Sequence, residues 1–210
     1  MDFSLYKTMP LEDWINSIYL QNSICTPNDL EFGQISSIFG GEVIYLPTNS
    51  HARWIDDGTN EFLIVLNNRL DEVAIRGQFF HELCHPLRHS GNQKVLPRAF
   101  CDLQEAQAFH FQLYSSMPFY MVQELDLPLY EKDIIQYMSH IFRVPIELAA
   151  HRFKQIKARI HQEEYRLTIS AHLQEWYRKS NPENWSDETK TLFRLALKRK
   201  FEKEREVVIS

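Results

Sequence analysis

The 210-residue sequence lacks the features that mark a secreted or membrane-embedded protein. No apolar run reaches the roughly 18 residues that a membrane-spanning helix needs. The first seven residues include an acidic side chain where a signal peptide carries positive charge, and no apolar segment follows them. These absences predict a cytoplasmic protein with no membrane-spanning segment.

Cysteine is scarce, with only Cys25, Cys84 and Cys101. An odd number without framework spacing argues against a disulfide-stapled fold and is typical of reduced thiols in a cytosol. The sequence also has no glycine-rich phosphate loop, and neither a Ser-His-Asp nor a Cys-His-Asn pattern stands out in it. Phosphate-loop nucleotide binding and catalysis by a serine or cysteine nucleophile therefore have no support.

Hydrophobic residues make up 44% of the chain and aromatic residues 13%, which is enough for a folded core. Charge is unevenly distributed: residues 1–150 hold 9 basic and 19 acidic side chains, and residues 151–210 hold 14 and 9. This asymmetry suggests a separate role for the C-terminal part, although a solvated helix face explains it as well. The interleaved acidic residues argue against direct nucleic-acid binding.

Apolar spacing predicts a helix from Pro10 and a second from Thr26–Pro27 to Gly40–Gly41. Short runs rich in β-forming residues then predict three strands, at 43–46, 52–55 and 62–66, with a hairpin turn at 56–60 between the last two. Further helices are expected at 98–116, at 130–142 and from Pro145 onward. The helix at 98–116 should bury one stripe, formed by Phe100, Leu103, Ala106, Phe109 and Leu113.

A helix beginning near Asp71–Glu72 carries the central motif, His81-Glu82-Leu83-Cys84-His85. Histidines four residues apart lie on one helix face, so that both rings can bind one metal ion, and Glu82 can act as general base. The alternative is an ordinary amphipathic helix with two surface histidines. Pro86 should kink this helix or end it within a turn of His85, and residues 87–97 should form an exposed loop.

The motif extends to His81–His89, which is H-E-L-C-H-P-L-R-H, and Glu105–Phe109 is E-A-Q-A-F, followed by Met117–Pro118. This resembles the ImmA/IrrE family of zinc metallopeptidases, whose pattern is H-E-x-G-H-x-x-x-H and then E-A-N-x-F-A-x-x-L-L-M-P. The resemblance runs from about Tyr6 to about Ile160.

The chain departs from the family pattern at three places. Cys84 replaces a glycine, Gln107 replaces an asparagine, and Tyr114-Ser115-Ser116 stands where the pattern has Leu-Leu. None of these departures removes a metal ligand or the general base.

The third metal ligand must come from another element, and Glu105 is the preferred candidate. It is a hard anionic ligand on a helix that can pack across the motif helix, and it matches the glutamate of the family pattern. Asp102, one turn earlier on the same face, is the rival, or else a group that orients a ligand histidine. A closed structural zinc site that includes Cys84 or Cys101 is a further alternative.

The resemblance implies an α+β fold, mostly helical and zincin-like, with a small three-stranded sheet before the motif helix. Residues 1–160 would form the metallopeptidase domain. Residues 161–210 would form a charged helical extension, broken near Ser180–Glu183. Its apolar side chains need a surface to bury against, either that domain, which is the preferred choice, or a partner.

The resemblance also implies one Zn²⁺ per chain and a zinc-dependent endopeptidase of narrow specificity. Glu82 would activate a zinc-bound water, and the substrate would be a transcriptional repressor, of helix-turn-helix type, encoded on a phage or other mobile element. A strand edge beside the metal would hold the extended peptide. The oxyanion donor stays open among His89, His110, His151 and Tyr114. The alternative function is a non-catalytic zincin-like protein that docks a regulator or nucleic acid.

Overall fold

The computed structural model describes residues 1–55, 61–89, 96–179 and 182–209. The chain divides into two compact units, Met1–Ile160 and His161–Ser210. This division falls where the family resemblance ends. The assignment of the second unit as a separate extension stays a prediction.

The first unit consists of a small sheet followed by helices, and this order confirms the predicted α+β, mostly helical fold class. The elements are α1 (Pro10–Gln21), α2 (Phe32–Ile38), β1 (Gly41–Leu46), β2 (His51–Trp54), β3 (Phe62–Asn67), α3 (Glu72–Arg88), α4 (Arg98–Ser116), α5 (Phe119–Val122), α6 (Glu131–Phe142) and the start of α7 (Ile146–Lys179). Short 3₁₀ turns occupy Phe3–Leu5 and Pro27–Asp29.

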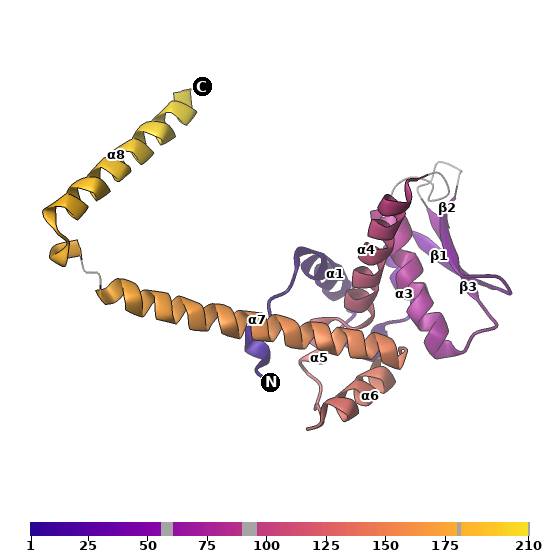
Figure 1. Cartoon of the computed structure of the whole chain (residues 1–210). Coiled ribbons are helices and arrows are strands. Elements are labelled where there is room, and N and C mark those ends of the chain that lie inside the picture. The colour runs from indigo at the N-terminus through magenta and orange to yellow at the C-terminus, as the bar shows by residue number, and fades with distance from the viewer. Residues whose placement is uncertain (56–60, 90–95, 180–181, 210) are drawn as a thin grey trace. The chain divides into compact units, whose positions relative to one another are not determined.

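The sheet has the strand order β1-β3-β2, with β1 parallel and β2 antiparallel to β3. The central strand β3 is almost completely buried, and α3 packs beside β2 and β3 (Figure 1). At Gly41, a β-carbon would lie 2.2 Å from the Phe62 ring, so only glycine fits there. The two strands of the predicted hairpin, β2 and β3, pair antiparallel as expected. The turn predicted at 56–60 lies outside the described residues.

Helix α3 begins at a well-formed cap, because the Asp71 carboxylate accepts a hydrogen bond from the Ala74 amide at 2.8 Å. Its apolar face is buried, including Phe79, Phe80 and Leu83. The helix continues through Pro86 and ends at Arg88, within one turn of His85. The predicted loop therefore starts two residues later than expected, and its residues 90–95 lie outside the described part of the chain.

The continuous helix predicted from Thr26 to Gly40 is wrong. A 3₁₀ turn at Pro27–Asp29 comes first, and α2 begins only at Phe32. The Asp29 carboxylate accepts hydrogen bonds from the amides of Cys25 and Thr26, at 3.0 and 2.7 Å. This carboxylate closes a local turn and competes with helix propagation.

The predicted buried stripe of α4 is also wrong over the first half of that helix. Phe100 and Leu103 are 44% and 52% exposed, whereas Gln104, Ala108 and Phe111 are buried. Packing against α3 sets this rotation of the helix, which turns Glu105 towards His81. The same rotation leaves Phe100 and Leu103 exposed to solvent.

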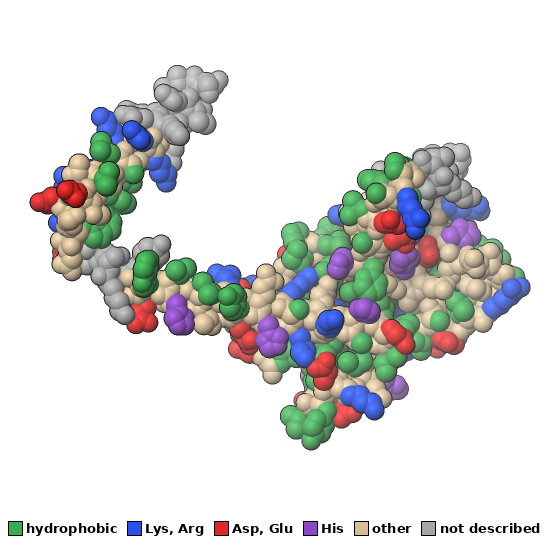
Figure 2. Space-filling model, viewed as in Figure 1, with side chains coloured by type: hydrophobic (Ala, Val, Ile, Leu, Met, Phe, Trp, Pro, Cys, Tyr) green, Lys and Arg blue, Asp and Glu red, His purple; other side chains and the backbone are tan. Residues whose placement is uncertain are grey.

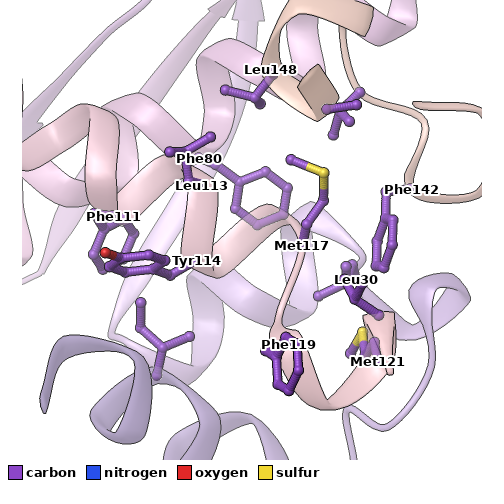
Figure 3. Close-up of a cluster of buried hydrophobic side chains, with 14 of the residues drawn as sticks. Leu30, Phe80, Phe111, Leu113, Tyr114, Met117, Phe119, Met121, Phe142 and Leu148 are labelled. Atoms are coloured by element: carbon purple, nitrogen blue, oxygen red, sulfur yellow. The ribbon is translucent and has the colours of Figure 1, made fainter. Parts of the chain in front are cut away.

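The hydrophobic core joins elements that are distant in sequence. Figure 3 shows Phe80 of α3, Leu113 of α4, Phe142 of α6 and Leu148 of α7 around the Met117 side chain. All five side chains are at most 5% exposed. Burial of this apolar area from four helices fixes α3 and α4 within one packed body.

A buried ion cluster fixes α1 to α7. Arg152 Nη2 donates to Glu12 Oε1 at 2.6 Å, and these two side chains are 0% and 1% exposed. The Tyr6 hydroxyl donates to Glu12 at 2.7 Å, and Arg159 donates to the same carboxylate. Burial alone raises the pKa of Glu12, but the positive charge of Arg152 and the hydrogen bonds outweigh it and hold that pKa below its ordinary value.

The second unit contains the rest of α7, a 3₁₀ turn at Pro182–Asn184 and α8 (Asp187–Ile209). Several apolar side chains on these helices are exposed, as the space-filling view shows along α8 (Figure 2). They include Trp176 at 71% and Leu192 at 68%. Docking of this apolar surface on the first unit stays a prediction. No helix in the described residues is long and apolar enough to cross a membrane.

Most of the basic excess of residues 151–210 lies in residues 151–160, within the first unit. Residues 151–160, which end that unit, contain four basic and no acidic side chains, and Arg152 and Arg159 among them join the ion cluster. Residues 161–210 hold 10 basic and 9 acidic residues, a net charge of +1. The second unit is therefore nearly neutral in net charge.

Replacing Glu12 should destabilise the first unit. We expect Glu12→Gln to lower the free energy of unfolding by about 3–5 kcal/mol, because it leaves the Arg152 charge buried without its partner. The exposed Glu124→Gln is the control and should change stability by less than about 0.5 kcal/mol. Urea denaturation of both variants measures the difference.

The same substitution predicts a pH dependence. Because the pKa of Glu12 is lowered in the folded state, its stabilisation is present at neutral pH and is lost as the pH falls. The gap in stability between the wild type and Glu12→Gln should therefore narrow only below the ordinary glutamate pKa of about 4.3. A stability difference between the wild type and Glu12→Gln that narrows above pH 6 would contradict the lowered pKa of Glu12.

Truncation after Ile160 tests the boundary between the two units. If residues 161–210 form a separate extension, the shortened chain should unfold in one cooperative transition and bind as much zinc as the full chain. Circular dichroism and metal analysis of the purified protein provide the two measurements. Loss of either property would make the second unit part of the core.

Candidate metal centre

His81, His85 and Glu105 lie together, with one ligand atom of each within 4.8 Å of the others. The Nε2 atoms of the two histidines are 3.3 Å apart. Glu105 Oε2 lies 3.1 Å from His81 Nε2, and Glu105 Oε1 lies 3.9 Å from His85 Nε2. The motif spacing on α3 stacks the two rings, and the rotation of α4 brings the carboxylate to them.

These distances fit a tetrahedral zinc ion. Bonds of about 2.0–2.1 Å at tetrahedral angles separate neighbouring ligand atoms by about 3.3 Å, close to the values observed here. Two imidazoles and one carboxylate are also a donor set that catalytic zinc uses, with a fourth position left for water. The His85 ring has the required neutral state, because burial, assisted by His81, lowers its pKa to about 4.

His89 lies behind His85. The two Nδ1 atoms are 3.0 Å apart, so a His85 ring that presents Nε2 to a metal can donate its Nδ1–H to His89. The side chain of Gln107 in turn hydrogen-bonds His89. From the sequence, His89 is predicted only as a candidate oxyanion donor. Its spacing of four residues from His85 was the signal that could have indicated this contact.

Glu82 points to the sheet side of the same centre. Burial raises the pKa of Glu82 to about 7, and the nearby Glu105 charge adds to the rise, while a hydrogen bond from the Ala52 backbone opposes it. A carboxylate with a pKa near neutrality can both accept and release a proton near neutral pH. Bound zinc would add a positive charge that favours the ionised form.

The rival ligands do not join this group. Asp102 is exposed and lies outside the cluster that the described residues form. Cys84 is buried, and burial raises the pKa of its thiol to about 12, which disfavours the thiolate that zinc binds. The Cys101 sulfur lies 3.8 Å from the Leu96 carbonyl oxygen.

The remaining oxyanion candidates have other surroundings. Tyr114 and His110 line a cavity beside α1 and α7, and the Tyr114 hydroxyl accepts a hydrogen bond from Gln155. The His151 ring packs edge-on against Phe109. None of the three belongs to the metal-ligand group formed by the described residues.

A helix carrying His-Glu-x-x-His beside a small sheet, with a glutamate from the next long helix facing both histidines, defines a metallopeptidase-type site. A family model described as the IrrE N-terminal-like domain of peptidase M78 matches residues 37–154. That range covers more than half of the chain, so the chain belongs to this peptidase family. The resemblance to the ImmA/IrrE family is thereby confirmed.

Two relatives from Bacillus subtilis (strain 168) are similar over most of the chain. One is named uncharacterized protein YqaB and is 25% identical over 168 residues, which cover 80% of this chain and 96% of the relative. The other is named phage-like element PBSX protein XkdA and is 28% identical over 149 residues, which cover 71% and 74%.

The geometry predicts unequal effects for the two acidic residues of α4. Glu105→Ala should abolish zinc retention, because it removes a charged ligand, whereas Asp102→Ala should weaken zinc binding by less than about 10-fold. Metal analysis after dialysis against a weak chelator separates the two variants.

The cysteines provide the matched control, since Cys84→Ala and Cys101→Ala should each retain about one zinc per chain. Metal loss in either cysteine variant, with zinc kept in Glu105→Ala, would instead indicate a structural site and contradict the proposed ligand set.

Proposed function

We propose that this protein is a zinc-dependent endopeptidase of narrow specificity, with His81, His85 and Glu105 as ligands and Glu82 as general base. The supporting observation is the convergence of these three ligand side chains next to Glu82 in a member of a peptidase family. One zinc ion per chain satisfies this donor set.

Bound zinc supplies Lewis-acid chemistry, which polarises a peptide carbonyl and lowers the pKa of water. Glu82 accepts the proton of the attacking water and delivers it to the leaving amine. His89 holds the His85 ring through Nδ1 and keeps Nε2 directed at the metal.

The edge of β2 is the proposed peptide-binding edge. Among the described strands β2 pairs only with β3, and the Ala52 backbone hydrogen-bonds Glu82. Ala52 therefore directs its backbone polar groups away from β3, towards the general base. A substrate strand added along β2 would bring its scissile bond next to Glu82.

The proposed substrate is a transcriptional repressor of helix-turn-helix type, from a phage or other mobile element. This part of the proposal depends on the family resemblance and on the relative named as a protein of a phage-like element. An edge strand would hold an extended segment of such a repressor by strand addition.

Replacing the general base separates catalysis from metal binding. Glu82→Gln should retain one zinc per chain and lose at least 10²–10⁴-fold in hydrolysis rate, because it removes proton transfer and no ligand. Metal content and cleavage of a candidate helix-turn-helix repressor are measured on one purified preparation.

Glu72→Gln, an exposed change at the start of the same helix, is the matched control and should cleave at the wild-type rate. Unchanged cleavage by Glu82→Gln would reject the role of Glu82. Repressor binding without cleavage by the zinc-loaded wild type would favour the non-catalytic docking function.

A further inference from the structure

Three departures from the family pattern meet in one cavity. Cys84 of α3 and Gln107 and Tyr114 of α4 all line a cavity of about 710 Å³ within the first unit. These three residues are spread over 31 positions of the sequence, yet all three line the same cavity. The cavity has a size that suits a small ligand or a side chain.

The cavity is positively charged. Arg88 and Arg159 line it, and its lining among the described residues includes no acidic side chain. Arg159 belongs to the buried cluster in which Arg152 is the second arginine and Glu12 the one carboxylate. Positive charge is concentrated here although the whole chain carries a net charge of −5. A concave site with charge of one sign attracts a ligand of the opposite sign.

Hydrogen-bond donors also outnumber acceptors at this wall. The Tyr114 oxygen accepts hydrogen bonds from Gln155 Nε2, at 3.1 Å, and from Arg159 Nη2, which together occupy both of its lone pairs. Its hydroxyl proton is then directed to an acceptor outside these partners. Arg159 donates through Nη1 to Tyr6 and Glu12 and through Nη2 to Tyr114, which leaves Nε–H and one Nη2–H without an acceptor among the described residues.

Arg88 is held at the cavity by the Trp14 ring, with the guanidinium carbon 5.6 Å from the ring centroid. Among the described residues, no carboxylate forms an ion pair with it. Met9 and Leu11 supply an apolar wall. The cavity thus combines charged donors with an apolar surface, which suits a carboxylate attached to a short carbon chain.

We propose that this cavity is a carboxylate-binding site, in which Arg159, Arg88 and the Tyr114 hydroxyl hold the carboxylate and Met9 and Leu11 contact the carbon chain of the ligand. The carboxylate belongs either to an acidic side chain of a bound polypeptide or to a small free carboxylic acid. The site is separate from the three metal ligands, and its occupancy does not depend on hydrolysis.

Calorimetric titration of the zinc-loaded full-length protein tests the site. Glutarate at constant ionic strength should bind saturably with one ligand per chain, and uncharged glutaramide should not. Tyr114→Phe and Arg88→Gln should each weaken glutarate binding about 10-fold or more, since each removes a hydrogen bond to a charged group. Tyr130→Phe and Arg69→Gln, both exposed and outside the cavity, are the matched controls and should bind like the wild type.

Two short peptides identify the source of the carboxylate. They are acetylated and amidated Gly-Gly-Glu-Gly-Gly and the same peptide with glutamine in place of glutamate. Tighter binding of the glutamate peptide than of glutarate, with competition between them, would assign the site to an acidic side chain. Glutarate binding without peptide binding would assign it to a free carboxylic acid, and either result supports the proposal.

The proposal is overturned if neither glutarate nor the glutamate peptide binds saturably. It is also overturned if binding is unchanged in both Tyr114→Phe and Arg88→Gln, because the carboxylate would then occupy the metal centre or another surface. Thermal unfolding of each variant checks that its fold is intact. Arg88 is exposed, so Arg88→Gln remains informative even if Tyr114→Phe destabilises the buried cluster. Since no cleavage is measured, failure here would leave the proposed peptidase activity standing.

Discussion

The pairing of Glu12 with Arg152 is the constraint on which the first unit depends. A buried charge is costly unless its partner is present, so α1 and α7 must meet even though 140 residues separate these two side chains. Arg152 also donates to the Met117 carbonyl at the end of α4, and Arg159 to the Tyr114 hydroxyl. One ion cluster therefore holds three helices, and α4 is one of them.

The position of α4 determines the metal centre. Gln112 donates to the Gly77 carbonyl at 2.8 Å, which fixes α4 against α3 one turn before His81. With that contact made, Glu105 faces the two histidines without any adjustment of the backbone. Packing between helices thus brings the proposed ligand set together, and preorganisation of this kind reduces the cost of binding.

Local signals in the sequence predicted local structure well. The Asp71 cap, the apolar side of α3 and the motif spacing were sufficient to predict the motif helix, and the bounds of α4 also agreed with the prediction. Contacts between distant residues were beyond such signals. The buried face of α4 depends on α3, and Glu12 carries no mark in the sequence that distinguishes it from exposed glutamates. The role of Glu105 as a ligand stays a prediction, although the structure brings it to His81 and His85.

Helix α4 connects the two sites described above. Glu105 lies on its flank towards the metal, and Gln107 and Tyr114 lie on the flank that lines the cavity. Gln107 contacts His89, and His89 contacts His85, so a continuous line of hydrogen bonds runs from the cavity wall to a metal ligand. Such a line of hydrogen bonds couples the cavity to the proposed metal centre only if one of its residues has two arrangements. With Nε2 of His85 on a metal, His85 Nδ1–H is the donor and His89 Nδ1 the acceptor, so a neutral His89 ring carries its proton on Nε2. The other tautomer of His89 would require a His85 ring protonated on Nε2, so the two arrangements of His89 correspond to a His85 ring that binds the metal and one that does not.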